Sequence, residues 1–173
     1  LGGCQALIGM PGVEPNTKII FDPQVAYLIV GVQSDSYAVN NIMACRGQTG
    51  FSCLNVFLPT GAQQGVYVIR YPVNNKPTRF AAIILGPSLS NSNIRASAGR
   101  PDMRIDKPGI YYFGVINVKS RTDKPGLKEQ FTSTITGSRH LGYVSVNHML
   151  SVEIIEAAKR KYSSVFNAYK LFL

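Results

Sequence analysis

The sequence contains no tryptophan, two histidines, three cysteines and nine acidic residues among its 173. Its longest apolar run, residues 25–32, has the length of a strand and is far shorter than the ~18 residues that span a bilayer. The two histidines, His140 and His148, have no acidic residue between them, which excludes a His-Glu-x-x-His zinc motif. Neither a Cys-x-x-Cys pair nor a glycine-rich phosphate loop occurs. We therefore expect no metal, no cofactor and no membrane-spanning segment.

Catalytic motifs are also scarce. The segment Gly86-Pro87-Ser88-Leu89-Ser90 approaches the Gly-x-Ser-x-Gly nucleophile elbow but lacks its final glycine. A polar stretch, residues 91–93, follows where that elbow requires a helix, so a turn at the end of a strand is the simpler interpretation. A pair of catalytic carboxylates stays open, although Asp102 and Asp106 both lie beside basic residues, where ion pairing explains them. We expect no enzymatic activity.

The chain is long enough for one globular domain with a substantial core. From Lys18 onwards, short runs of β-branched and aromatic residues alternate with turn residues. The runs are 18–21, 25–33, 41–45, 53–58, 65–71, 79–85, 102–105, 109–118, 130–135 and 142–146. This pattern predicts a mainly β fold, an antiparallel β-sandwich of immunoglobulin or transthyretin type, rather than alternating strands and helices.

One turn stands out. Pro108 presets φ at the second position of a β-turn, and Gly109 supplies positive φ at the third, so the pair predicts a type II hairpin turn. The run that follows, residues 110–118, is apolar on both faces, which predicts a central strand.

After Val146 the apolar period becomes helical. One face carries six apolar or aromatic residues, Val152, Ile155, Tyr162, Val165, Phe166 and Tyr169. Ser151 is suited to cap the N-terminus of an amphipathic helix of about five turns, over residues 150–170. Such a helix either packs across the sheet or offers its far end to a partner protein. The partner-binding residues would then be Tyr169, Leu171, Phe172 and Leu173.

Basic residues dominate the middle of the chain. Between Arg70 and Arg139, twelve Lys or Arg face four Asp or Glu, so this part carries +8 of the formal charge of +9. A basic surface can contact anionic lipid, lipopolysaccharide phosphates or an acidic protein, or it can simply be solvated. The segment 107–115 resembles an RNA-recognition strand in its basic and aromatic mix, but Tyr111 and Phe113 alternate with Tyr112 and its apolar density is that of a core element. We expect no nucleic-acid binding.

The first four residues, Leu1-Gly2-Gly3-Cys4, resemble the lipobox that ends the signal peptide of bacterial lipoproteins. The resemblance implies that Cys4 becomes the lipidated mature N-terminus and that the signal peptide's hydrophobic region precedes Leu1. Because Gln5 rather than Asp follows Cys4, it also implies sorting to the outer membrane, on its periplasmic face. The alternative is an ordinary cysteine near a frayed terminus. A second resemblance, from Pro108-Gly109 through Tyr112, is to uncharacterised β-sandwich domains of bacterial lipoproteins and implies a fold type only.

With Cys4 assigned to lipid, Cys45 and Cys53 remain as a pair. Gly47 and Gly50 between them let the chain turn back, so we expect a disulfide worth about 2.5 kcal/mol, with two buried thiols as the alternative. An oxidising envelope compartment favours the disulfide.

These observations predict a tether over residues 1–17 and a single domain over 18–173. The expected function is that of an outer-membrane lipoprotein serving as a non-enzymatic structural or binding subunit of an envelope assembly, such as a secretion-system core complex. The alternative is a ligand-binding module or serine hydrolase of the cell envelope.

Overall fold

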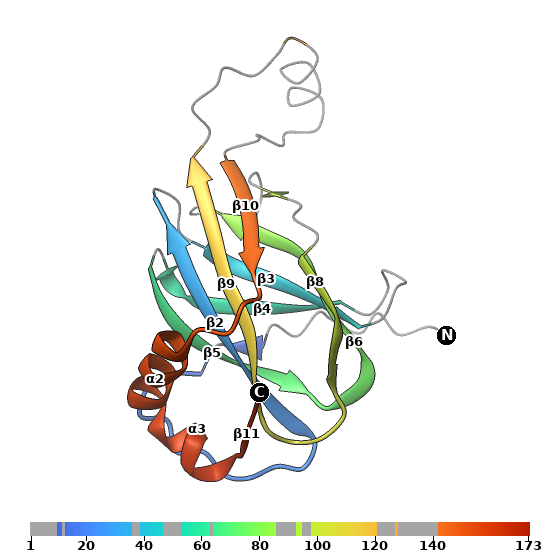
Figure 1. Ribbon diagram of the computed structural model, residues 1–173, viewed down its shortest axis with the longest axis vertical. Helices are drawn as coiled ribbons and strands as arrows, with labels where there is room; N and C mark the ends of the chain where they lie inside the picture. The colour runs from blue at the N-terminus through green and yellow to red at the C-terminus, as the bar shows by residue number, and fades with distance from the viewer. Residues whose placement is uncertain are drawn as a thin grey trace, which may run out of the picture.

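The computed structural model describes residues 10–11, 13–35, 39–46, 53–62, 64–85, 93–94, 98–120, 127 and 142–173, and it consists mainly of strands (Figure 1). In chain order its elements are β1 (Met10–Pro11), β2 (Val25–Ser34), β3 (Val39–Arg46), β4 (Cys53–Ala62), β5 (Gln64–Pro72), β6 (Asn74–Leu85), β7 (Asn93–Ile94), β8 (Ala98–Ile105), β9 (Ile110–Ser120), β10 (Gly142–Asn147), α2 (Val152–Lys161), α3 (Ser163–Ala168) and β11 (Leu171–Phe172).

Most predicted strands are confirmed. The eight runs between residues 25 and 118 and at 142–146 correspond to β2, β3, β4, β5, β6, β8, β9 and β10. The strand predicted at 18–21 is wrong, because those residues are irregular, and it is Val13 whose N–H reaches the Val68 carbonyl of β5, at 3.1 Å. The run at 130–135 lies outside the described residues.

The strands form two sheets, and both are mixed. The six-stranded sheet has the order β1-β4-β3-β6-β7, with β8 also on β6, and the five-stranded sheet has the order β10-β9-β2-β5, with β11 also on β9. Three pairs are parallel, β1 with β4, β2 with β9 and β11 with β9. The prediction of a purely antiparallel arrangement is therefore wrong. Between β2 and β9 the chain crosses into the other sheet and back twice, so these two neighbours are not joined by a hairpin.

The predicted hairpin turn at Pro108-Gly109 is also wrong. β8 pairs with β6 and β9 pairs with β2 and β10, so this turn carries the chain from one sheet to the other. Among the described glycines, positive φ occurs at Gly65 and Gly114 and not at Gly109. Gly109 is needed for a different reason, because a Cβ there would overlap the ring of Phe172. The central position of β9, between β2 and β10, is confirmed.

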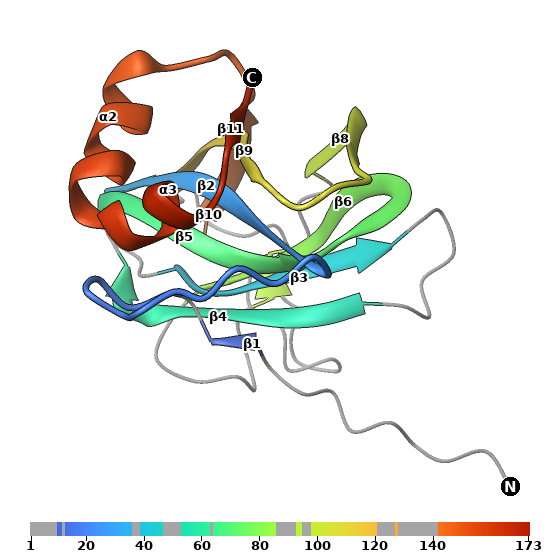
Figure 2. The ribbon, with the colours of Figure 1, turned by 90° about the horizontal axis from the view of Figure 1, so that it is seen from below.

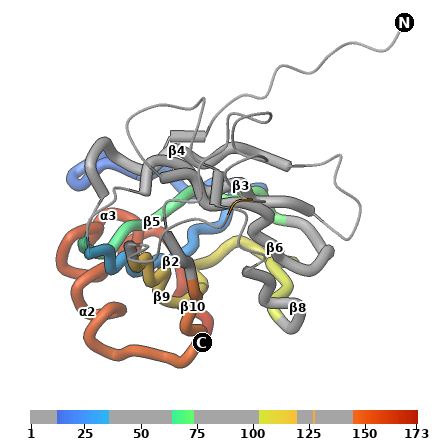
Figure 3. The backbone as a smooth tube through the Cα atoms, turned by 90° about the horizontal axis from the view of Figure 1, so that it is seen from above, coloured from blue at the N-terminus to red at the C-terminus, as the bar shows by residue number. Residues whose placement is uncertain are grey.

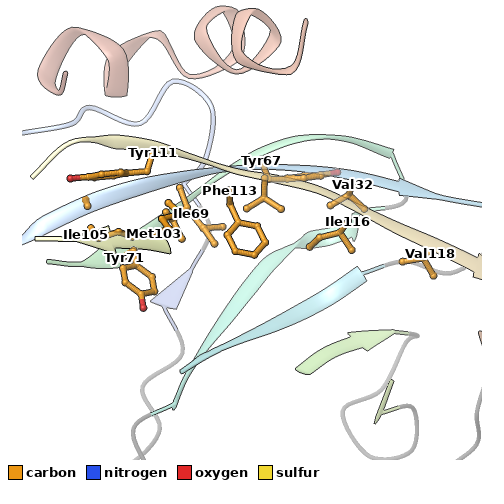
Figure 4. Close-up of a cluster of buried hydrophobic side chains, with 13 residues drawn as sticks. Val32, Tyr67, Ile69, Tyr71, Met103, Ile105, Tyr111, Phe113, Ile116 and Val118 are labelled. Carbon is orange, nitrogen blue, oxygen red and sulfur yellow. The ribbon is translucent and has the colours of Figure 1, made fainter. Parts of the chain in front are cut away.

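One buried cluster lies on the face of the five-stranded sheet that points away from the helices (Figure 4). β2, β5 and β9 contribute Leu28, Ile69 and Phe113, each completely buried. Met103 and Ile105 of β8, from the other sheet, join the same cluster. The two sheets therefore share a core at least at this corner, and Figure 2 shows β3, β4 and β6 lying across that side of β2 and β5.

The opposite face of the five-stranded sheet is covered by α2 and α3 (Figures 2 and 3). Ile155, Ala158 and Val165 pack there against apolar residues of β2, β5 and β9, which include Ile29, Val68 and Ile110. β2 is accordingly buried on both faces, as its run of eight buried residues shows. The C-terminal helical segment thus completes the core.

This segment is two short helices rather than the single five-turn helix predicted. Ser151 caps α2 as expected, and its hydroxyl accepts the Ile154 N–H at 3.4 Å. The helix breaks at Tyr162, whose φ of −122° and ψ of 44° are not helical. The Tyr162 hydroxyl donates to the Val66 carbonyl of β5 at 3.4 Å, and burial raises the pKa of this phenol to about 12. Tyr162 is 1% exposed, so this buried side chain attaches the junction of the two helices to the sheet.

The predicted tether is shorter than expected. β1 pairs in parallel with β4, with Met10 opposite Val56, and Val13 is buried. The folded body therefore begins by Met10, and the boundary predicted after residue 17 is too late.

Candidate functional site

A gap in the edge of the five-stranded sheet forms the candidate site. On the side of β9 that faces away from β2, β10 pairs with Val115–Ser120 and β11 pairs with Ile110 and Tyr111. Neither strand pairs with residues 112–114, which therefore lie between two short edge strands. A sheet edge left open in this way presents backbone groups that need other partners.

A β-bulge lies in this gap. Opposite β2, Ile29 pairs with Tyr112 and Val30 with Gly114, so Phe113 is an extra residue. Gly114 has a φ of +142°, and a Cβ there would overlap the carbonyl oxygen of Asn147. Only glycine fits both demands, because other residues rarely adopt this φ and all carry a Cβ.

His148 closes the gap from the end of β10. Its Nδ1 lies 2.9 Å from the Phe113 carbonyl oxygen, and its ring meets the Phe113 ring edge to face, with centroids 5.1 Å apart. Because a carbonyl only accepts, Nδ1 carries the proton, and Nε2 of the neutral ring is an acceptor. Beside it, the Tyr112 hydroxyl donates to the Met149 carbonyl at 3.1 Å. These bonds fix the chain between β10 and α2 against β9.

A groove of about 330 Å³ lies at this place. Its lining comes from β8, β9, β11 and the segment after β10, and consists of Met103, Arg104, Tyr111, Tyr112, His148, Leu150, Phe172 and Leu173. Leu150 is 54% exposed and Leu173 is 79% exposed, although both are large aliphatic residues. Met149 and Val152, which flank Leu150 in the chain, are also exposed. The groove thus has a patch of uncovered apolar side chains at its rim.

Positive charge lies at the Phe172 and Arg104 side of the groove. The Lys107 ammonium lies 4.3 Å from the centre of the Phe172 ring, and that of Lys170 lies 5.7 Å from it. Arg104 lines the groove itself. The acidic residue beside these cations is Asp106, which is exposed. Burial is the main cause that raises the pKa of Tyr111, and the negative charge of Asp106 is the second. Three cations against one carboxylate favour an acidic or anionic occupant.

The C-terminal residues that were predicted to bind a partner differ in their exposure. Tyr169 is 5% exposed, so this assignment is corrected to a core residue. Its burial follows from the helical period, which places it with Val165 over β2. Leu171 and Phe172 form β11 and are half-buried, and Leu173 is exposed. Phe172 and Leu173 line the groove.

Other predicted site residues are only partly described. Cys4, Ser88 and His140 lie outside the described residues. Cys45 and Cys53 are directly opposite each other in the antiparallel register of β3 and β4, although their side chains are outside the description. Their disulfide stays a prediction.

The groove itself was not predicted. Met149 and Leu150 immediately precede the cap of α2, where apolar residues normally pack against the first turn as a hydrophobic staple. Sequence reasoning would therefore bury them. Arg104 gave no signal, because it is one of many basic residues.

Within the described part of the chain, no three His, Cys, Asp or Glu side chains gather as a metal site would require. In the same residues, no helix has the length and apolarity to cross a membrane.

Comparisons with known proteins identify no relative. No protein-family model matches the chain, and no curated protein or solved structure matches it significantly.

Proposed function

We propose that this chain is a lipid-anchored, non-enzymatic binding module of the bacterial envelope, whose groove docks a segment of a partner protein. The observation that carries the proposal is the pair of exposed walls, Leu150 and Leu173, beside the cations Arg104, Lys107 and Lys170. Uncovered apolar rims around a fixed concave surface are typical of interaction sites.

The proposed occupant is an extended segment with an apolar anchor and acidic flanks. The anchor would lie against Leu150 and Phe172, which form apolar parts of the lining. Acidic flanks would complement Lys107 and Lys170, whose ammonium groups lie on the Phe172 ring. Because Tyr112 and His148 are held by hydrogen bonds, the groove needs little reorganisation on binding.

The proposed anchor is acylation of Cys4, in the outer membrane on the periplasmic side. Because β1 begins at Met10, only five residues separate Cys4 from the folded body, a reach of at most about 20 Å. Tethering raises the effective concentration of a partner in the same membrane, so the groove needs only modest intrinsic affinity. By analogy with lipoproteins of this size, a secretion-system core complex is the leading assembly.

Two finer structural proposals accompany this function. The sheets would form a sandwich of immunoglobulin or transthyretin type, which Met103 and Ile105 support by joining the core of the five-stranded sheet. Cys45 and Cys53 would form a disulfide. Opposed residues of an antiparallel pair have Cα atoms about 4.5–5.5 Å apart, which suits that bond.

A ligand-binding module is the second candidate. Arg104 and the imidazole of His148 both line the groove, whose volume of about 330 Å³ lies at the small end of small-molecule sites. An anionic small molecule, rather than a protein segment, would then neutralise the cations.

Site-specific photocrosslinking in the native cells tests the docking proposal. We expect a crosslinker at Leu150 or Leu173 to trap one discrete protein, and one at Lys159, exposed on α2 and outside the groove, to trap none. Arg104→Glu with Lys107→Glu should lower the yield at Leu150 by about tenfold, because the cations attract the partner. Equal yields at Leu150 and Lys159 would contradict the proposal.

A further inference from the structure

Two neighbouring apolar residues, Ile20 and Phe21, protrude from the segment that leads into β2. Ile20 is 77% exposed and Phe21 is 55% exposed. Lys18 beside them is exposed as well. Single exposed apolar residues are ordinary, but an adjacent aliphatic and aromatic pair next to lysine is the composition of an interfacial membrane contact.

The segment that carries Ile20 and Phe21 is held in place by Tyr169. The Phe21 ring lies against the Tyr169 ring, with centroids 5.2 Å apart. The Tyr169 hydroxyl accepts the N–H of Asp22 at 2.7 Å and donates to the Asp22 carbonyl at 3.2 Å. The Asp22 carboxylate meets Arg70 at 3.4 Å, across an exposed pair. The Phe21 ring and the Asp22 backbone are therefore held against a buried tyrosine, while more than half of the Phe21 side chain stays exposed.

Tyr169 is a firm support because it lies in the core. It is 5% exposed and meets the Tyr27 ring edge to face, with centroids 4.9 Å apart. Burial, with the neighbouring Tyr169 as a further cause, raises the pKa of Tyr27 to about 12, so the Tyr27 hydroxyl stays neutral at physiological pH.

The apolar surface extends beyond the side chains of Ile20 and Phe21. A shallow hollow lies beside them, and the apolar part of its lining consists of Val13, Ile19, Ile20, Phe21, Val25 and Tyr27. The charges that face it, Glu14 and Asp22 against Lys18 and Arg70, cancel formally. Contact with a lipid surface at this place would therefore depend on apolar insertion more than on charge.

We propose that Ile20 and Phe21 insert into the surface of the bilayer and orient the folded body on it. This inference rests on the proposed anchor at Cys4. β1 holds Met10 on β4, Val13 is bonded to β5, and Ile20 follows Cys4 by only sixteen residues, so the proposed anchor and Ile20 are close in the chain. Insertion of the pair would add a second point of attachment to the first.

The orientation has a definite consequence. β2 and β9 are parallel, so the beginning of β2 and the end of β9 lie at opposite ends of the five-stranded sheet (Figure 1). With the segment before β2 on the lipid, Lys119 near the end of β9 would point away from the membrane.

The absence of tryptophan allows a direct test, since Phe21→Trp would place a sole indole at the proposed contact. The full chain would carry a hexahistidine tag in place of the Cys4 lipid and bind vesicles of phosphatidylethanolamine, phosphatidylglycerol and a nickel-chelating lipid. We expect brominated lipid to quench Phe21→Trp at least about twofold more than the matched control Lys119→Trp. Circular dichroism would verify that both variants fold.

Equal quenching of the two variants would overturn the orientation. So would capture of a protein in native membranes by a crosslinker at Phe21, because the pair would then be a protein contact. The tag holds the chain on the vesicle whether or not Cys4 is acylated in cells, so this result bears on orientation alone. Failure of the anchor would appear separately, as an unmodified Cys4 in the native protein.

Discussion

Phe21 and Tyr169 are aromatic residues whose rings touch, yet one is surface and the other is core. Their centroids are 5.2 Å apart, while their exposed fractions are 55% and 5%. Tyr169 follows α3 at a position that the helical period turns toward β2, and its hydroxyl is bonded to Asp22. Phe21 lies in an irregular segment with no period to direct it. For this pair, position relative to the regular structure, more than side-chain chemistry, decides which aromatic ring is exposed.

Tyr169→Ala should have the largest effect on stability of the substitutions at this aromatic pair. The substitution would remove a buried ring and both hydrogen bonds to Asp22, so we expect the free energy of unfolding to fall by about 3–5 kcal/mol. Urea denaturation followed by circular dichroism measures the change. Tyr169→Phe, which keeps the ring, should cost only about 1–2 kcal/mol. A loss below about 1 kcal/mol for Tyr169→Ala would contradict its place in the core.

Alkaline titration sharpens the contrast between buried and exposed aromatics. Burial raises the pKa of Tyr162 to about 12, against 10 in the unfolded chain. The stability that this shift represents is fully present below pH 10 and is lost between pH 10 and 12, because the unfolded chain releases the proton first. We expect Tyr162→Phe to reduce this loss by up to about 1.4 kcal/mol per pH unit, measured by urea unfolding at intervals across that range. Identical alkaline slopes in the two proteins would contradict the burial of this hydroxyl.

The smallest expected effect is that of Phe21→Ser on stability. More than half of the side chain is exposed, so we expect the free energy of unfolding to change by less than about 0.5 kcal/mol. The same urea measurement as for Tyr169→Ala applies. A loss near that of Tyr169→Ala would mean that the pair forms one structural unit and would remove the contrast.

The sequence predicted the regular elements better than the irregular segments. Periodic patterns located β2 and β9, the cap at Ser151 and the buried positions Ile155 and Val165. The run at 18–21 has strand composition but no strand partner in the described chain, because pairing is decided by tertiary neighbours. Composition could not reveal that Val152 would be exposed despite its place in the helical period.

The candidate groove depends on features that have no local pattern. The bulge at Phe113 arises from the register of β9 against β2, two strands far apart in the sequence. The parallel pairing of β11 with β9 likewise joins Phe172 to Tyr111 across the domain. Gly114 is visible in the sequence, but the need for a residue without a Cβ there is apparent only once Asn147 is in place.

We propose that a lipid on Cys4 holds this chain on a membrane. Intact mass measurement of the protein from the membrane fraction of its native cells, with mapping of the N-terminal peptide, tests it most directly. We predict a mature chain that begins at Cys4 and carries diacylglyceryl and acyl groups. An unmodified Cys4 in that fraction would contradict the claim.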